Sequence, residues 1–133
     1  MPDGFHALGL AAFFRRGDVL RFLIEHGADV AAPARNRLAV TALHSAVATD
    51  AAPVDHGIVR TLLDAGAPVN VGHLGGGTPL HTTAFTGDLE SARMLLDHGA
   101  DPHARMDDGR TAVDVARERG NTEVLALLER TRE

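Results

Sequence analysis

The sequence predicts an all-α fold built from four stacked helix-turn-helix repeats. Two recurring pieces of sequence support this prediction. A piece that opens with threonine occurs at Thr41–His44, Thr78–His81 and Thr111–Asp114. A piece that opens with glycine and alanine occurs at Gly27–Asp29, Gly66–Pro68 and Gly99–Asp101. Thr78 and Thr111 stand 33 residues apart, a period that suits one pair of helices per repeat.

The composition fits one domain with a core made of small packing units. The chain has 133 residues, of which 44% are apolar and 23% charged, so it carries enough apolar surface for a core. Aromatic residues make up only 4%, all of them phenylalanine, which favours packing through Ala, Leu and Gly. The formal net charge of −5 argues against a nucleic-acid binder, because phosphate contacts need a surplus of cations.

The third copy shows why each repeat folds as two helices. Thr78 is a good N-cap, and Pro79 suits the first helical position, where a missing N–H costs nothing. Gly87 breaks the first helix. A second helix over Leu89–Asp97 has apolar residues at helical spacing, and Gly99 supplies the left-handed position that ends it. Since neither helix can bury its apolar side alone, stacking of the copies has to build the core.

The period, the opening at Thr78–His81 and the ending at Gly99–Asp101 closely resemble ankyrin repeats, and the resemblance covers essentially the whole chain. It implies an all-α solenoid with hairpin-like loops that project from the helices, in a stand-alone protein of bacterial type. The loop tips and inner helices of this family form a concave binding face. We expect a single domain, 1–133, with repeats at about 4–38, 39–75, 76–108 and 109–133.

The first copy departs from the pattern of the family. It has His6–Gly9 in place of the threonine-led opening and Arg15 in place of the turn glycine, and its second helix is expected over Val19–His26. Its helices are mostly apolar, with Leu8, Leu10, Phe13, Phe14, Leu20, Phe22 and Ile24. We therefore expect a poorly capped N-terminal edge. Either a preceding repeat is missing from the chain, or this edge packs on a second copy.

The second and fourth copies differ from the third in length and polarity. Thr41 stands 25 residues before Gly66, where the third copy has 21, so four extra residues are expected between the helices, in Ala48–Gly57. The loop around Ala31–Leu38 is also longer than usual. The fourth copy is expected to cap the stack, with the charged residues Arg117, Glu118, Arg119, Glu123, Glu129 and Arg130.

Eight histidines raise the question of a metal site, but their repetition favours a structural interpretation. The resemblance implies that His44 and His81 belong to hydrogen-bond networks between their own loop and the next repeat. His26 and His98 occupy equivalent positions near helix ends, where a cation favours the helix dipole. Three more fall in expected loops, namely His56, His73 and His103. We expect no metal and no cofactor.

The sequence holds no motif for catalysis. It has no cysteine, no nucleophile elbow and no phosphate-binding loop. The glycine run Gly75–Gly77 and the acids Asp107 and Asp108 fall at expected loop tips, so we interpret them as a turn and as solvated charges. We expect no catalytic residue, and a hydrolytic Asp–His pair between repeats is the remote alternative.

The candidate site is a partner-binding surface on the concave face that the resemblance implies. The residues expected there are Phe5, Phe13, Phe14, Leu38, Val40, Leu74, Phe85, Thr86, Asp108 and Arg110. Aromatic side chains gathered on one exposed face indicate an interaction surface. Phe22 is expected in the core. In the alternative interpretation, Phe13 and Phe14 tuck partly into the first helix pair and Phe85 leans on its neighbour.

The leading hypothesis is a protein-binding module with a protein partner that the sequence does not name. A self-associating scaffold, or a fragment of a longer solenoid joined through the apolar N-terminal edge, is the alternative. No nucleic acid and no membrane are expected as partners, because the charge is negative and no apolar stretch reaches the length of a membrane span. The N-terminus has no basic residue before its short apolar run, so a cytoplasmic location is expected.

Overall fold

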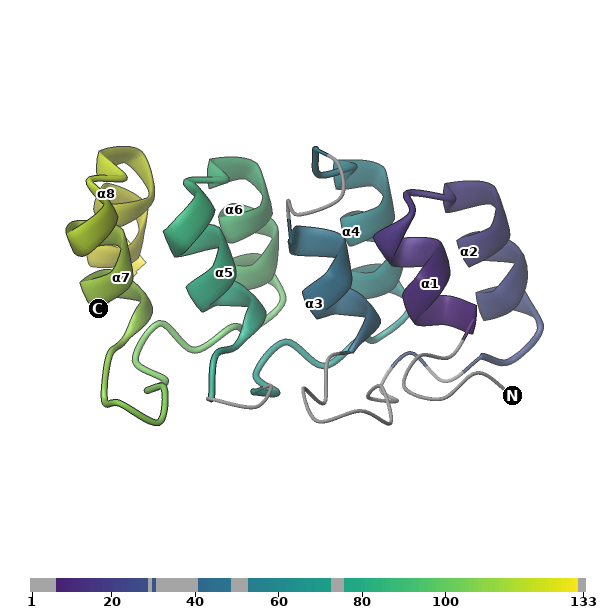
Figure 1. Cartoon of the computed structure of the whole chain (residues 1–133), viewed down its shortest axis with the longest axis horizontal. Helices are drawn as coiled ribbons and strands as arrows, with labels where there is room; N and C mark the ends of the chain where they lie inside the picture. The colour runs from purple at the N-terminus through teal and green to yellow at the C-terminus, as the bar shows by residue number, and fades with distance from the viewer. Residues whose placement is uncertain (1–6, 29, 31–40, 49–52, 73–75, 132–133) are drawn as a thin grey trace. The chain divides into compact units, whose positions relative to one another are not determined.

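The computed structural model describes residues 7–28, 30, 41–48, 53–72 and 76–131 (Figure 1). Over these residues the chain forms eight α-helices and no β-strand. The helices follow one another as four helix-turn-helix pairs, which confirms the predicted all-α repeat fold. The chain divides into two compact units, unit 1 over Met1–Pro68 and unit 2 over Val69–Glu133.

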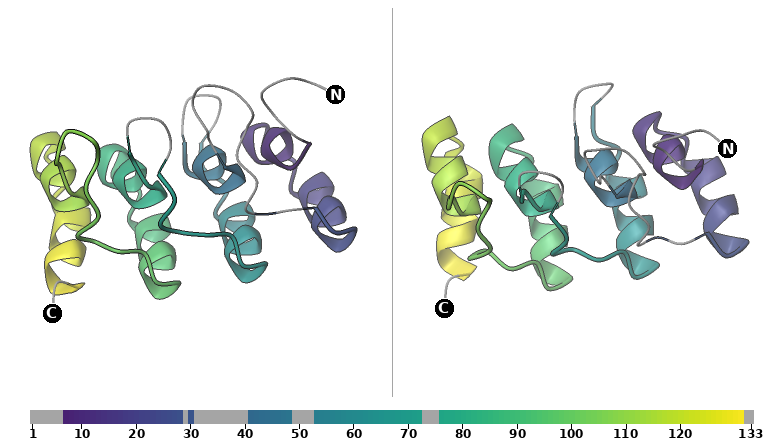
Figure 2. Two further views of the ribbon diagram at one scale, coloured as in Figure 1. Left: turned by 90° about the horizontal axis from the view of Figure 1, so that it is seen from below. Right: turned by 60° about the horizontal axis from the view of Figure 1, so that its bottom comes forward.

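Unit 1 contains two helix pairs. They are α1 (Ala7–Phe13) with α2 (Gly17–Glu25), and α3 (Ala42–Val47) with α4 (His56–Asp64). The first helices of the two pairs lie side by side, as do the second helices (Figure 2). The core between them consists mainly of aliphatic side chains, namely Leu8, Leu20, Leu43, Val47, Val59 and Leu62.

Unit 2 repeats this arrangement. Its pairs are α5 (Pro79–Thr86) with α6 (Leu89–Asp97), and α7 (Ala112–Arg119) with α8 (Thr122–Thr131). Helix α6 has the predicted bounds. Helix α5 packs along α7, and α6 along α8 (Figure 2). Small and aliphatic side chains fill the core, namely Leu80, Ala84, Leu95, Val115, Ala116, Val124 and Leu128.

The threonine-led pieces begin the first helix of a pair, as predicted. Thr41 Oγ1 accepts a hydrogen bond from the N–H of His44 at 3.3 Å, and His44 Nδ1 accepts one from the N–H of Thr41 at 3.1 Å. Asp114 takes the place of the histidine at α7, where its Oδ2 accepts the N–H of Thr111 at 3.1 Å. These reciprocal bonds satisfy backbone donors that the first turn of a helix leaves without a partner.

The enlarged second copy has its extra residues between its helices. Helices α5 and α6 are joined by Gly87 and Asp88 alone, whereas the connection from α3 to α4 runs from Ala48 to Asp55. The predicted insertion therefore lies in this connection, of which 49–52 fall outside the described residues, as does the longer loop expected around 31–38. The connection ends at Asp55, whose Oδ1 accepts the N–H of Gly57 at 2.9 Å and caps α4.

The core position predicted for Phe22 is wrong. Its side chain is 57% exposed, and its ring stacks on His26 with the ring centroids 4.1 Å apart. Leu20 is the residue of α2 that is fully buried. Because each residue of an α-helix advances by about 100°, a side chain two positions after Leu20 points away from the core. The predicted start of α2 at Val19 is also two residues late.

Arg15 occupies the turn position that glycine takes in unit 2. Its φ is 59°, and the equivalent Gly87 and Gly120 have φ of 82° and 72°. Its guanidinium donates to Ala12 O at 2.8 Å and Ser45 O at 3.0 Å, and also to the carbonyls of Ala48 and Pro53. Partial burial lowers the pKa of Arg15, and the nearby Asp55 opposes that effect. Arg15 thus joins the end of α1 to the end of α3 and to the enlarged connection.

Candidate protein-binding site

Six of the ten predicted surface residues lie in the part of the chain that the structure describes. Phe13 and Phe14 belong to unit 1, and Phe85, Thr86, Asp108 and Arg110 belong to unit 2. The other four, Phe5, Leu38, Val40 and Leu74, fall outside the described residues.

In unit 1 the aromatic pair lies at the C-terminal end of α1. Phe14 is 62% exposed, whereas Phe13 is half-buried. The two rings meet edge to face, with their centroids 5.0 Å apart. Edge-to-face packing fits the quadrupoles of the rings and holds Phe14 in place although little protein covers it. Of the pair, Phe13 is therefore partly buried, whereas the side chain of Phe14 is exposed to solvent.

In unit 2 an exposed phenylalanine lies at the C-terminal end of α5. Phe85 is 53% exposed, and the guanidinium carbon of Arg119 lies 4.2 Å from the centroid of its ring. The backbone of Phe85 is fixed from below, since Asn121 Nδ2 donates to Ala84 O at 2.7 Å and to Phe85 O at 3.0 Å. A cation over a ring face and a bonded backbone both limit the freedom of this side chain.

A charged cluster stands next to Phe85. Arg110 donates through Nε to Asp108 Oδ2 at 2.9 Å and through Nη1 to Glu118 Oε1 at 2.7 Å. These two bonds raise the pKa of Arg110, and the bond to Glu118 has the larger effect. The pKa of Asp108 is lowered, chiefly because the backbone N–H of Arg110 donates to its Oδ1 at 3.0 Å. The arrangement holds the guanidinium of Arg110 in a defined orientation.

His81 positions the loop that carries this cluster. It is buried; its Nδ1 accepts the N–H of Thr78 at 3.0 Å, and its Nε2 lies 3.1 Å from Ala104 O and 3.3 Å from Arg110 O. Since carbonyls only accept, the ring proton is on Nε2. The structural role expected for His81, a link from its own helix to the next loop, is confirmed by these contacts.

The loop itself is closed like a hairpin. The N–H of Met106 donates to Arg110 O at 2.9 Å, and the N–H of Gly109 donates to Met106 O at 2.9 Å. Gly109 has a φ of 90°, which residues with a Cβ rarely adopt. The short turn brings Met106 and Arg110 to the same side, toward α5.

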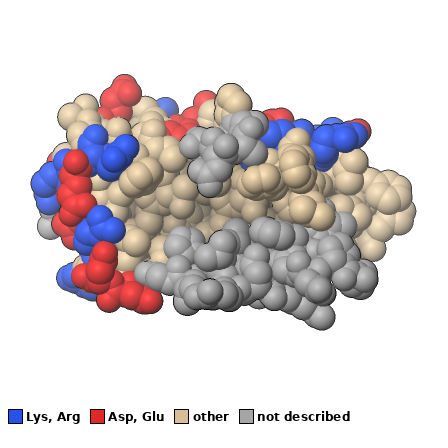
Figure 3. Space-filling view, in the orientation of Figure 1, with Lys and Arg blue, Asp and Glu red and all other residues tan. Residues whose placement is uncertain are grey.

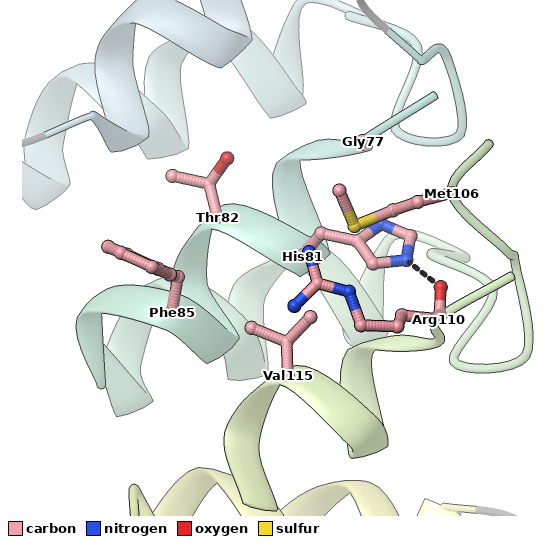
Figure 4. A pocket seen from close by; sticks show the side chains of 7 residues that line it. All are labelled: Gly77, His81, Thr82, Phe85, Met106, Arg110 and Val115. Carbon is pink, nitrogen blue, oxygen red and sulfur yellow. Dashed lines mark hydrogen bonds between the residues drawn. The ribbon is translucent and has the colours of Figure 1, made fainter. Parts of the chain in front are cut away.

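These residues enclose a small pocket in unit 2. Its volume is about 180 Å³, and it is lined by Gly77, His81, Thr82, Phe85, Met106, Arg110 and Val115. Figure 4 shows side chains of α5, of the loop and of α7 around a common space. Of the predicted residues, Phe85 and Arg110 line it. Thr86 does not, because its hydroxyl donates to Thr83 O at 3.4 Å on its own helix, and Asp108 contacts Arg110 from outside.

The sequence reasoning missed Thr82, Met106 and Val115 as members of this pocket. Thr82 precedes Phe85 by three positions, a spacing that places both on one side of a helix, so this signal was present in the sequence. Met106 gave no comparable signal, because its position depends on the turn at Gly109 and on the bond between His81 and the loop.

On the face that Figure 3 shows, the last helix pair of unit 2 carries charges of both signs. In Figure 3 red and blue side chains alternate along the end formed by α7 and α8, whereas the surface over α5 is mostly uncharged. Arg117 lies 3.6 Å from Asp114 and 3.8 Å from Glu129. The polar character predicted for the last repeat agrees with these exposed charges, and the apolar part of the surface begins at Phe85.

His26 and His98 occupy equivalent structural positions, whereas His56, which was expected in a loop, is the first residue of α4. His26 Nδ1 lies 2.8 Å from Phe22 O, and His98 Nδ1 lies 2.8 Å from Met94 O, so the two copies use the same bond at the end of the second helix. Among the described residues, His, Asp and Glu form no group of three with a spacing suited to a metal ion. Within the same residues, no helix has the length and apolar character that a membrane span requires.

Comparison with known proteins agrees with the fold. A family model described as "Ankyrin repeat" matches residues 3–35 and 40–73, and one described as "Ankyrin repeats (many copies)" matches residues 62–116. Together with the helix pairs, the capping boxes and the loop anchored by histidine, these matches cover most of the chain. The chain belongs to the ankyrin-repeat family.

Several larger proteins contain a similar segment. XBAT34 of Arabidopsis thaliana is 42% identical over 74 residues, and XBOS34 of Oryza sativa subsp. japonica is 40% identical over 74 residues; their names assign them provisionally to the E3 ubiquitin-protein ligases. Each match covers 54% of this chain, but only 20% and 14% of the respective relative. The E3 ubiquitin-protein ligase hecd-1 of Caenorhabditis elegans is 42% identical over 64 residues, which is 48% of this chain and 2% of that protein.

Proposed function

We propose that this chain is a protein-binding module that contacts a protein partner through exposed phenylalanines, above all through the surface around Phe85 in unit 2. The observation that carries the proposal is Phe85, a large apolar side chain that is 53% exposed and yet held in place by Arg119 and Asn121. Anchor residues of protein interfaces are typically aromatic side chains or arginines of this kind, next to a pocket and surrounded by polar groups.

The energetics favour a partner for this surface. An exposed phenylalanine that becomes fully buried contributes about 1.5–3 kcal/mol to binding. A side chain that is already ordered loses little conformational entropy when a partner covers it. Phe14 of unit 1 has the same character, because its edge-to-face contact with Phe13 orders its ring while 62% of its surface stays exposed.

We propose no catalytic role for the chain. Its pocket in unit 2 combines apolar side chains with an arginine that is already paired, and this arrangement offers no activated nucleophile or base. Because the ligases named above match this chain over no more than a fifth of their length, we propose no ubiquitin transfer. A cytoplasmic location is part of the proposal, as is the absence of nucleic-acid partners that the net charge of −5 predicts.

The test is capture of partners from the source cell on the immobilised chain. The parent is compared with a variant that carries Phe14→Ser and Phe85→Ser. Both residues are exposed, so the variant should keep the helical circular dichroism of the parent. We expect proteins that the parent captures reproducibly to be lost from the variant. If the same proteins are recovered equally by both, the proposed surface is wrong.

A second candidate function is self-association through α2, and the exposure of Phe22 favours it. Val19 is 37% and Phe22 57% exposed, and a spacing of three places them on one side of α2. Sedimentation velocity over a wide concentration range tests this candidate. A dimer that disappears with Phe22→Ser and persists with Phe85→Ser supports it, whereas a monomer at every concentration rules it out.

A further inference from the structure

We infer that the pocket of unit 2 takes one aliphatic side chain of a peptide segment whose neighbouring residue is acidic, with the acidic carboxylate paired to Arg119. This inference rests on the proposed function, since it states the chemistry of the partner at the same surface. It depends on three features of the described residues: the walls of the pocket, the unequal pairing of Arg110 and Arg119, and the rigid support beneath Phe85.

The walls of the pocket suit an aliphatic side chain. Phe85, Met106 and Val115 line the pocket from α5, the loop and α7, respectively (Figure 4). A volume of about 180 Å³ lies below the range of about 300–1,000 Å³ that is usual for cofactors and drug-sized ligands. The pocket is therefore large enough for a single side chain of a partner protein but not for a large ligand.

Arg110, which lines the pocket, and Arg119, which lies over the ring of Phe85, differ in their pairing. Arg110 already binds the carboxylates of Asp108 and Glu118, at 2.9 and 2.7 Å. Arg119 lies over Phe85 at 4.2 Å, and no described carboxylate lies within 4.0 Å of its guanidinium. Among the described residues of unit 2, Arg119 thus has no acidic partner, and charge complementarity calls for a carboxylate from outside.

A carboxylate at Arg119 and an aliphatic side chain in the pocket can come from neighbouring residues of one segment. The guanidinium of Arg119 stacks on the ring of Phe85, and the same ring forms a wall of the pocket. Because the pocket and Arg119 share this ring, two consecutive residues of a peptide, whose Cα atoms are 3.8 Å apart, are suited to contact both.

The site is built before any partner arrives. His81 holds the loop through Ala104 O and Arg110 O, and Asn121 holds the end of α5 through Ala84 O and Phe85 O. Binding therefore orders few protein groups, which lets a short segment bind with measurable affinity.

The test begins with selection of peptides from a random-sequence display library on the immobilised full chain. We expect enriched peptides to share an aliphatic residue next to Asp or Glu. A fluorescent copy of one such peptide is then titrated with the parent and with Phe85→Ala and Arg119→Gln, and anisotropy gives Kd. The control variants are Phe22→Ala on α2 and Arg130→Gln on α8, which remove the same chemistry from other places.

The inference predicts that Arg119→Gln raises Kd about tenfold and that Phe85→Ala raises it by at least as much, while both controls leave it unchanged. Replacing the acidic residue of the peptide by its amide should raise the Kd for the parent. The same replacement should leave the Kd for Arg119→Gln unchanged. The inference is overturned if no peptide is enriched, or if the enriched peptides lack the aliphatic–acidic pair. It is also overturned if Arg119→Gln leaves their Kd unchanged. If selected peptides or captured proteins still depend on Phe85, the proposed function survives that result; if neither requires the exposed phenylalanines, both fail.

Discussion

Arg15 shows how a single residue replaces a glycine and gains a new role. A left-handed backbone costs a residue with a Cβ about 1–2 kcal/mol. The guanidinium of Arg15 donates hydrogen bonds to four carbonyls. Three of these carbonyls, those of Ser45, Ala48 and Pro53, belong to the following repeat. A charged hydrogen bond contributes about 1.5–3 kcal/mol, so a few of them outweigh the backbone cost. The enlarged connection of the second copy is thereby fixed to the first.

The first prediction separates the backbone of Arg15 from its side chain. Arg15→Lys keeps the backbone cost and loses the fork of donors, so we expect it to lower the free energy of unfolding by about 1–3 kcal/mol. Arg15→Gly also loses the donors but relieves the backbone, and should lie between the lysine variant and the parent. Urea denaturation followed by circular dichroism measures the order. A lysine variant as stable as the parent would contradict the role given to the guanidinium.

The second prediction compares two glycines in opposite backbone conformations. Gly120 has a φ of 72°, so Gly120→Ala should cost about 1–2 kcal/mol. Gly17 begins α2 without a positive φ, and an added Cβ would meet only ordinary contacts, the nearest at 3.5 Å from Arg21. Gly17→Ala should therefore stabilise the chain by about 0.4–1 kcal/mol. Thermal unfolding of both variants should shift the Tm in opposite directions, and shifts of the same sign would refute this assignment.

At the level of the elements, the capping residues determine where helices begin, and the sequence was informative there. Thr78, Pro79 and Gly87 predicted the limits of α5, and the bounds of α6 were predicted exactly as observed at Leu89 and Asp97. Sequence reasoning failed for Phe22, because a mostly apolar helix does not reveal which side faces its neighbours. It also failed for Met106, because a long-range bond to His81 sets the loop, and spacing along the chain carries no trace of that bond.

The third prediction concerns the cap of α7 and its pH dependence. The pKa of Asp114 is lowered, chiefly because the backbone N–H of Thr111 donates to its carboxylate. A carboxyl whose pKa is lowered by folding stabilises the fold above its unfolded pKa, about 3.9, and this contribution is lost as the pH falls through the folded value. Asp114→Asn keeps an acceptor but does not titrate.

The difference in unfolding free energy between the parent and Asp114→Asn should therefore favour the parent at pH 6 to 7 and shrink below about pH 4. Urea unfolding of both proteins over this pH range measures it. Asp64→Asn at the end of α4 serves as a comparison that leaves this cap intact. A difference that does not change with pH would show that the charge of Asp114 contributes nothing to the cap.

At the level of the whole molecule, the chain has two apolar surfaces that are candidates for binding. Phe22 on α2 favours a second copy of the chain, whereas Phe85 and the pocket of unit 2 favour a different protein. The family was evident from the sequence because the repeat period and its motifs recur along the chain. The position of the binding surface was only partly predictable, because it depends on which apolar side chains the packing leaves exposed.

The fourth prediction concerns salt. The proposed pairing of Arg119 with a carboxylate of the partner is exposed, so its contribution to affinity should weaken as ionic strength rises. The Kd of a selected peptide should increase with salt for the parent and much less for Arg119→Gln. Titrations at about 0.05 and 0.5 M salt measure the difference. Equal salt dependence for the two proteins would exclude Arg119 as the partner of the carboxylate.

The most direct test of the central claim is the affinity of a purified captured partner for three single variants. Isothermal titration gives Kd for the parent, Phe14→Ser, Phe85→Ser and Phe22→Ser. A buried aromatic anchor is worth 2 kcal/mol or more, so Phe85→Ser should raise Kd by at least about thirtyfold, with a smaller rise for Phe14→Ser. Phe22→Ser should leave Kd unchanged. A Kd that is insensitive to Phe85 and sensitive to Phe22 would contradict the claim.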